Sequence, residues 1–113
     1  MKVLLDLDGV HLEVDGSVLA ASGEADFDAA AALAASGCEW LREQPVGSAV
    51  CFDLCGVNRA SSAALSVMLE WLRCVRDQRL EVEAVRLSPP LARLTAMAGL
   101  DRLLSLETPT PAL

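Results

Sequence analysis

Alternating apolar and polar residues mark the start of the chain. Every second residue from Val10 to Val14 is apolar, and Asp15-Gly16 follows. An Asp-Gly pair after such a run predicts a hairpin, because glycine accepts the positive φ that the turn requires. The return strand is expected over residues 17–22, and residues 3–7 are a candidate for an extra edge strand.

Two longer segments repeat apolar residues every three to four positions, which is the helical period. Residues 26–43 form the first, and acidic residues at its start suit the N-terminal turn of a helix. Gly37 lies within its apolar stripe at a cost in helix propensity, so we expect it to pack closely against the sheet. Residues 61–77 form the second, whose stripe consists of Leu65, Met68, Leu69, Leu72 and Val75.

Short apolar runs predict the remaining strands. Ala49–Leu54 is bounded by turn residues, which is typical of a central strand covered on both faces. A loop over residues 55–60 follows it, and Leu80–Leu87 is the next strand. Ser88-Pro89-Pro90 predicts a third helix with serine as N-cap, and Gly99 is its expected end.

The predicted order β-β-α-β-α-β-α indicates an α/β domain. Strands that alternate with helices form parallel β-α-β units, so we expect a mixed sheet with a helical layer. The 113 residues suit a single domain over residues 1–106, which ends in a short apolar element at 103–106. Residues 107–113 contain two prolines and two threonines and are expected to be a disordered tail.

Charge and cysteine content narrow the function classes. Nine basic and 16 acidic residues give a net charge of −7, which repels phosphate backbones and lipid headgroups, so neither nucleic-acid binding nor direct membrane insertion is expected. The N-terminus reaches Asp6 too early for a signal peptide. The four cysteines form no C-x-x-C pair. We therefore expect free thiols rather than disulfides or a zinc site, and a cytoplasmic location.

Asp6-Leu7-Asp8-Gly9 is the one candidate for catalysis, since it resembles the opening motif of haloacid-dehalogenase-type phosphotransferases. In that family the first aspartate is the nucleophile and the second is an acid/base. Such chemistry also needs a cationic group and further carboxylates for magnesium. The only lysine, Lys2, precedes the motif, and no later strand ends in paired acids. We therefore predict a strand followed by a turn, with no catalytic residue, cofactor or metal.

Two other polar features have structural explanations. His11 is the only histidine, and with no second histidine or suitable nucleophile it cannot build a catalytic triad. The acidic residues Glu24, Asp26 and Asp28 are too few for a calcium loop and instead suit the positive end of the following helix.

The segment after the central strand is the most informative. Ser61 and Ser62 open the second helix. One serine suits the N-cap, while the other lies in the first turn, where free N–H groups and the helix dipole favour an anion such as phosphate. Plain capping and a binding role both fit these two residues.

Three features in order resemble the STAS domain, the fold of anti-sigma factor antagonists. They are Gly23-Glu24-Ala25-Asp26, Asp53-Leu54-Cys55-Gly56-Val57 and Ser61–Leu65, and the set spans about residues 10–106. In the family the third is usually Asp-Ser/Thr-x-Gly-Leu, so Ser62 matches the residue that a partner kinase phosphorylates. Ser61 replaces the aspartate and Ala64 the glycine, which favours a constitutive docking surface over a switch.

Leu65–Arg73 and Ser88–Leu104 resemble more narrowly the small cytoplasmic subunit of the Mla phospholipid transporter of bacteria. This resemblance implies a non-catalytic STAS subunit that docks on the ABC transporter ATPase, supports its assembly or activity, and is held peripherally at the inner membrane. The alternative is an antagonist-type signalling switch controlled by phosphorylation of Ser62. Without its partner the domain can form a homodimer through the orphaned surface. The expected partner-binding residues are Asn58, Arg59, Ala60, Ser61, Ser62, Ala63 and Ser66.

Overall fold

The computed structural model describes residues 2–7, 9–24, 27–58, 61–97 and 99. Strands and helices alternate after an opening run of three strands. In chain order the elements are β1 (Lys2–Leu7), β2 (Val10–Asp15), β3 (Val18–Gly23), α1 (Phe27–Arg42), β4 (Ala49–Val57), α2 (Ser62–Gln78), β5 (Glu81–Leu87) and α3 (Pro89–Met97).

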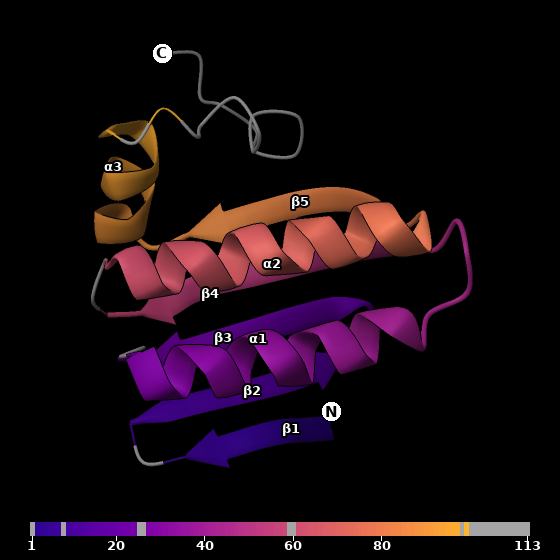
Figure 1. Ribbon diagram of the computed structural model, residues 1–113, viewed down its shortest axis with the longest axis horizontal. Coiled ribbons are helices and arrows are strands. Elements are labelled where there is room, and N and C mark those ends of the chain that lie inside the picture. The colour runs from indigo at the N-terminus through magenta and orange to yellow at the C-terminus, as the bar shows by residue number, and fades with distance from the viewer. Residues whose placement is uncertain (1, 8, 25–26, 59–60, 98, 100–113) are drawn as a thin grey trace.

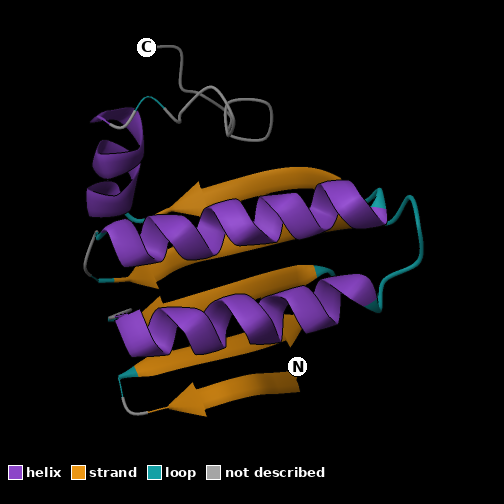
Figure 2. Cartoon of the chain, in the orientation of Figure 1, coloured by secondary structure: helices purple, strands orange, loops and turns teal. Residues whose placement is uncertain are grey.

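The five strands form one mixed sheet in the order β1-β2-β3-β4-β5. The first two pairings are antiparallel, and β3-β4 and β4-β5 are parallel. Helices α1 and α2 lie side by side on one face of the sheet, and α3 stands beside the end of β5 (Figures 1 and 2). The predicted α/β class is confirmed, and the candidate edge strand is present as β1.

The opening hairpin follows the predicted register. Asp15 pairs with Val18, which leaves a two-residue turn, and Gly16 adopts φ 64° there. Alternate residues of β2, such as Leu12, point into the core, where Leu12 is fully buried. The turn glycine therefore sets which residues of the hairpin face the helices.

The central strand differs from the prediction. Its burial alternates: Val50, Phe52 and Leu54 are buried beneath the helices, whereas Cys51 and Asp53 are only partly buried. The apolar run gave the wrong expectation of two covered faces because cysteine and alanine tolerate either environment. The strand also continues to Val57, so the predicted loop over residues 55–60 begins too early.

Gly37 packs against a helix and not, as predicted, against the sheet. A Cβ atom at this position would overlap the indole of Trp71 on α2, approaching its Cε2 to 2.5 Å. Trp71 is fully buried, and its Nε1 donates a hydrogen bond to the carbonyl oxygen of Leu33 at 3.3 Å. Its ring also packs against Phe52, with 5.5 Å between ring centroids. The missing side chain of Gly37 therefore makes room for the largest residue between the two helices.

The expectation of four free cysteines is wrong for one pair. Cys38 of α1 and Cys74 of α2 form a disulfide across a sequence separation of 36 residues. Motif spacing could not reveal it, because the two sulfurs meet only when the helices pack side by side. Cys51 and Cys55 are free, and Cys55 is exposed rather than part of the core.

The structure of α3 corrects one detail of the predicted Ser88 cap. Ser88 is the N-cap residue by position, and its carbonyl accepts from the Ala92 N–H at 2.8 Å. Its hydroxyl, however, is buried and bonds to no group in the described part of the chain. Pro90, the second helical residue, has no N–H to donate to this hydroxyl. The N–H of Leu91, the third helical residue, does not bond to it either.

The C-terminal end of α3 has the glycine that was predicted. The Gly99 N–H donates to the Ala96 carbonyl at 3.1 Å, and Gly99 adopts φ 73°, as a glycine after a helix commonly does. The predicted apolar element at 103–106 and the tail at 107–113 lie outside the described residues.

Candidate functional site

The beginning of α2 assigns separate roles to its two serines. Ser61 has extended backbone angles (φ −146°, ψ 163°) and is the N-cap. Its Oγ accepts from the Ala64 N–H at 3.2 Å, and its carbonyl accepts from the Leu65 N–H at 3.1 Å. Ser62 is the first residue of the helix and is exposed. Capping therefore accounts for Ser61 and leaves the side chain of Ser62 directed at solvent.

Ser62 begins an exposed line along α2. Residues spaced by three or four positions share one face of a helix, and Ser62, Ser66, Leu69 and Arg73 follow that spacing. All four are exposed, including Leu69, which was predicted to be part of the buried stripe and has 38% of its surface accessible. We call these four residues the outer α2 stripe. It presents two hydroxyl groups, then one apolar side chain, then a guanidinium.

An apolar groove lies next to this stripe, between the N-terminal halves of α1 and α2. It encloses about 210 Å³. Because β3 and β4 are parallel, the helices that follow them begin at the same edge of the sheet and run side by side (Figure 1). Small residues on both helices leave the space between them unfilled. The groove is lined by Ala30, Ala31, Ala34, Ala63, Ser66 and Val67.

The structure brings most of the predicted partner-binding residues to this end of α2. Ser61, Ser62 and Ser66 are at least partly accessible, but Ala63 is only 5% exposed and reaches a partner only through the groove. Asn58 is exposed at the carboxyl end of β4, where its N–H donates to the Gly23 carbonyl at 3.1 Å. Arg59 and Ala60 lie outside the described residues.

The predicted strand-and-turn explanation applies to the Asp6 motif. Asp6 is exposed on edge strand β1, and its Oδ1 lies 3.6 Å from Nδ1 of His11 on β2. Nε2 of His11 lies 3.8 Å from Oε2 of Glu13. Asp8 is outside the described residues. Among the residues that are described, no group of three or more His, Cys, Asp or Glu side chains is arranged to hold a metal ion.

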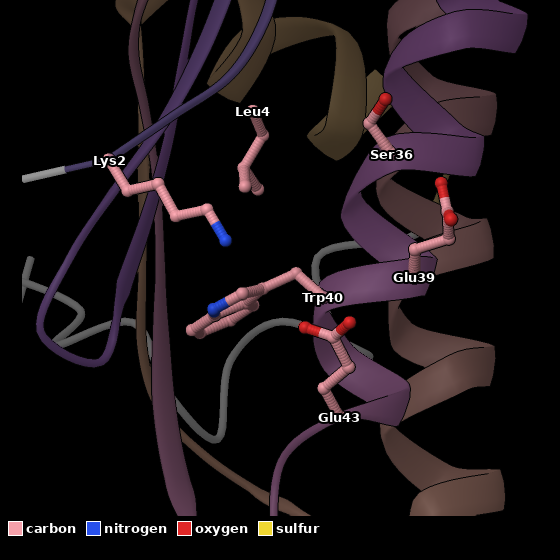
Figure 3. A pocket seen from close by; sticks show the side chains of 6 residues that line it. All are labelled: Lys2, Leu4, Ser36, Glu39, Trp40 and Glu43. Carbon is pink, nitrogen blue, oxygen red and sulfur yellow. The ribbon is translucent and has the colours of Figure 1, made fainter.

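A second depression, which the sequence did not indicate, lies between β1 and α1. It encloses about 150 Å³ and is lined by Lys2, Leu4, Ser36, Glu39, Trp40 and Glu43. Figure 3 shows Lys2 extending from β1 toward the indole of Trp40, with Glu43 on the α1 side of the ring. The aliphatic stem of a lysine commonly covers apolar surface in this way. Pattern reasoning could not find the depression, because it depends on how an edge strand meets a helix.

Comparison with known proteins identifies the family. The family model described as "Mlab, STAS domain" matches residues 8–106, a span that contains β2 to α3 and every predicted partner-binding residue. No curated protein matches the chain. STAS domains of this type are generally non-enzymatic and interact with partner proteins. With nearly its whole length matched, the chain belongs to the MlaB-like STAS domain family.

Proposed function

We propose that this protein is a non-catalytic subunit that docks on the ATPase of an Mla-type phospholipid ABC transporter and supports its assembly or activity. The observation that carries the proposal is the position of Ser62: exposed, at the start of α2, and next to an apolar groove. The contact surface consists of the outer α2 stripe, the groove and Asn58.

The chemistry of this surface suits a protein partner. Interfaces commonly combine a buried apolar anchor with a polar rim. The groove between Ala34 and Val67 provides space for one apolar side chain of the partner, and Leu69 adds an exposed apolar contact. Ser62 and Ser66 have short side chains, so a partner helix can approach the backbone of α2 closely.

A second candidate is the phosphorylation-controlled switch. It is favoured by the exposure of Ser62 at the first helical position, where a kinase can reach the hydroxyl and the helix dipole would stabilise a phosphate. The first proposal accounts better for Ser61, because a capping serine stands where the switch proteins usually carry aspartate.

Attachment to the membrane would come through the ATPase. No helix in the described part of the chain is long and apolar enough to cross a bilayer. With the ATPase at the inner membrane, the docking proposal places the protein in the cytoplasm, peripheral to that membrane.

Affinity purification from the native organism tests the docking proposal. The tagged wild-type chain should retain an ABC-type ATPase, and Ser62→Glu should lower its affinity for that ATPase at least tenfold by placing a charge against the interface. Ser17→Glu is the matched control, because Ser17 is also exposed but lies in the β2–β3 turn. Equal affinity of the two variants for the ATPase would contradict the proposal. Recovery of a serine kinase in place of the ATPase would also contradict it.

A further inference from the structure

The disulfide between Cys38 and Cys74 joins the two helices that form the groove. Each cysteine has 4% of its surface exposed. Their Cα atoms are 5.9 Å apart, within the roughly 4.4–6.8 Å that disulfides span. The backbones of α1 and α2 therefore space the two cysteines as a disulfide requires.

On its inner side the disulfide adjoins the packing of Gly37 against Trp71. Gly37 precedes Cys38, and its Cα faces the indole of Trp71, which lies one helical turn before Cys74. The Trp71 Nε1 is also bonded to α1 through the Leu33 carbonyl. Any change in the distance between the helices at the two sulfurs must therefore move this buried indole.

On its outer side the disulfide meets a cation. Nη2 of Arg42 lies 3.9 Å from Sγ of Cys74, and Arg42 is exposed. A guanidinium beside a sulfur stabilises the thiolate, and a stabilised thiolate leaves a disulfide more readily. Cys74 is therefore the better leaving group of the two cysteines.

We propose that Cys38 and Cys74 form a reversible disulfide–dithiol couple that locks α1 to α2. A thiolate of the reductant attacks Sγ of Cys38, and Cys74 leaves as a thiolate beside Arg42. A second thiol of the reductant then displaces Cys38, so that two electrons and two protons reduce the pair and the reductant becomes a disulfide. Glutathione disulfide reverses the reaction and is itself reduced to two glutathione molecules.

The two other cysteines do not take part in this couple. Cys51 and Cys55 lie on β4, whereas the couple joins α1 and α2. Desolvation, followed by the hydrogen bond and the negative charge of Asp53, raises the pKa of the Cys55 thiol. Cys55 is therefore protonated at neutral pH and a poor attacking group.

The couple does not depend on the proposed function, but its consequence for docking does. Both walls of the groove belong to the locked helices, with Ala34 four residues before Cys38 and Val67 seven residues before Cys74. Reduction should let the helices separate and change the shape of the groove.

The test equilibrates the full chain with mixtures of reduced and oxidised glutathione. Free thiols are alkylated and counted by mass spectrometry, and Trp71 fluorescence is recorded in a Trp40→Phe background. The count should change between two and four thiols in a single two-electron transition, since two of the four cysteines are paired. Trp71 emission should rise over the same range of mixtures, because reduction removes a neighbouring quencher and loosens the packing of the indole.

Two variants serve as controls. Cys38→Ala with Cys74→Ala should show two thiols and constant Trp71 emission in every mixture. Arg42→Gln should slow reduction by dithiothreitol several-fold while circular dichroism stays unchanged. Four alkylated thiols in every wild-type mixture would overturn the couple, and a thiol transition without a change in Trp71 would overturn the lock. Since these readouts need no partner, a normal transition combined with failure to bind the ATPase would contradict only the docking proposal.

Discussion

The two halves of the α1–α2 pair are packed in opposite ways. In the C-terminal half, Gly37 receives the Trp71 indole and a disulfide joins the helices. In the N-terminal half, alanines such as Ala34 and Ala63 face each other across an open groove. Small residues thus have two different effects. One glycine opposite a large aromatic ring produces tight packing, whereas small residues opposite small residues leave a space that a partner can fill.

Under the docking proposal, the tightly packed half of the helix pair supplies stability and the open half binds the partner. A fully buried indole removes a large apolar area from water and adds specific ring packing, here against Phe52. The alanine-lined half gains much less stability from burial, because an alanine side chain removes little apolar surface from water. Substitutions in the C-terminal half should therefore change the free energy of unfolding, and substitutions in the N-terminal half should change mainly the affinity for the partner.

The largest expected effect is on Trp71. Trp71→Ala removes the ring between the helices and leaves a cavity, so the free energy of unfolding should fall by about 4 kcal/mol, measured by urea denaturation. Leu69→Ala on the same helix is the control and should change it by less than about 1 kcal/mol, because Leu69 is exposed. Similar losses for both variants would mean that α2 is not held to α1 by its buried face.

A smaller loss is expected from filling the position opposite the ring. Gly37→Ala places a methyl group against the Trp71 indole, which is fully buried and cannot swing away. Overpacking costs about 1–3 kcal/mol, and the close overlap with the indole places this substitution near the upper end. Alanine regains up to about 1 kcal/mol of helix propensity, so the net loss should be about 2 kcal/mol.

The double variant separates these two contributions to the Gly37 effect. In a Trp71→Ala background the clash is absent, so adding Gly37→Ala should become neutral or stabilising in the same urea measurement. This reversal is a double-mutant coupling between the two residues. If the loss persisted without the ring, a contact other than the indole would be its cause.

Sequence reasoning succeeded where the determinants are local. The apolar period placed α1 and α2, the Asp15-Gly16 pair placed the hairpin, and Ser61-Ser62 marked the start of α2. These features depend on residues within one or two turns of each other, so a single sequence contains them. The alternation of strands and helices after the hairpin then predicted parallel β-α-β units, which the pairings β3-β4 and β4-β5 confirm.

What sequence reasoning missed depends on contacts between elements. The residue that Gly37 meets, the partner of Cys38, and the groove beside Ser66 all require the spacing of α1 and α2, which no periodicity reveals. The unbonded Ser88 hydroxyl could not be predicted from the Ser-Pro-Pro pattern either. Pro90 removes the donor at the second helical position, but Leu91 still offers one at the third, and only the structure shows that it is not used. The sequence thus indicated that Ser61 and Ser62 open α2, but not the shape of the surface beside them.

The smallest expected effects distinguish the two serines that open α2. Ser61→Ala removes the hydrogen bond to the Ala64 N–H and should lower the free energy of unfolding by about 1 kcal/mol. Ser62→Ala removes an exposed hydroxyl and should change it by less than about 0.5 kcal/mol. Urea denaturation measures both variants. A larger loss for Ser62 than for Ser61 would mean that Ser62 supports the fold, and its exposure at the start of α2 would no longer argue for docking.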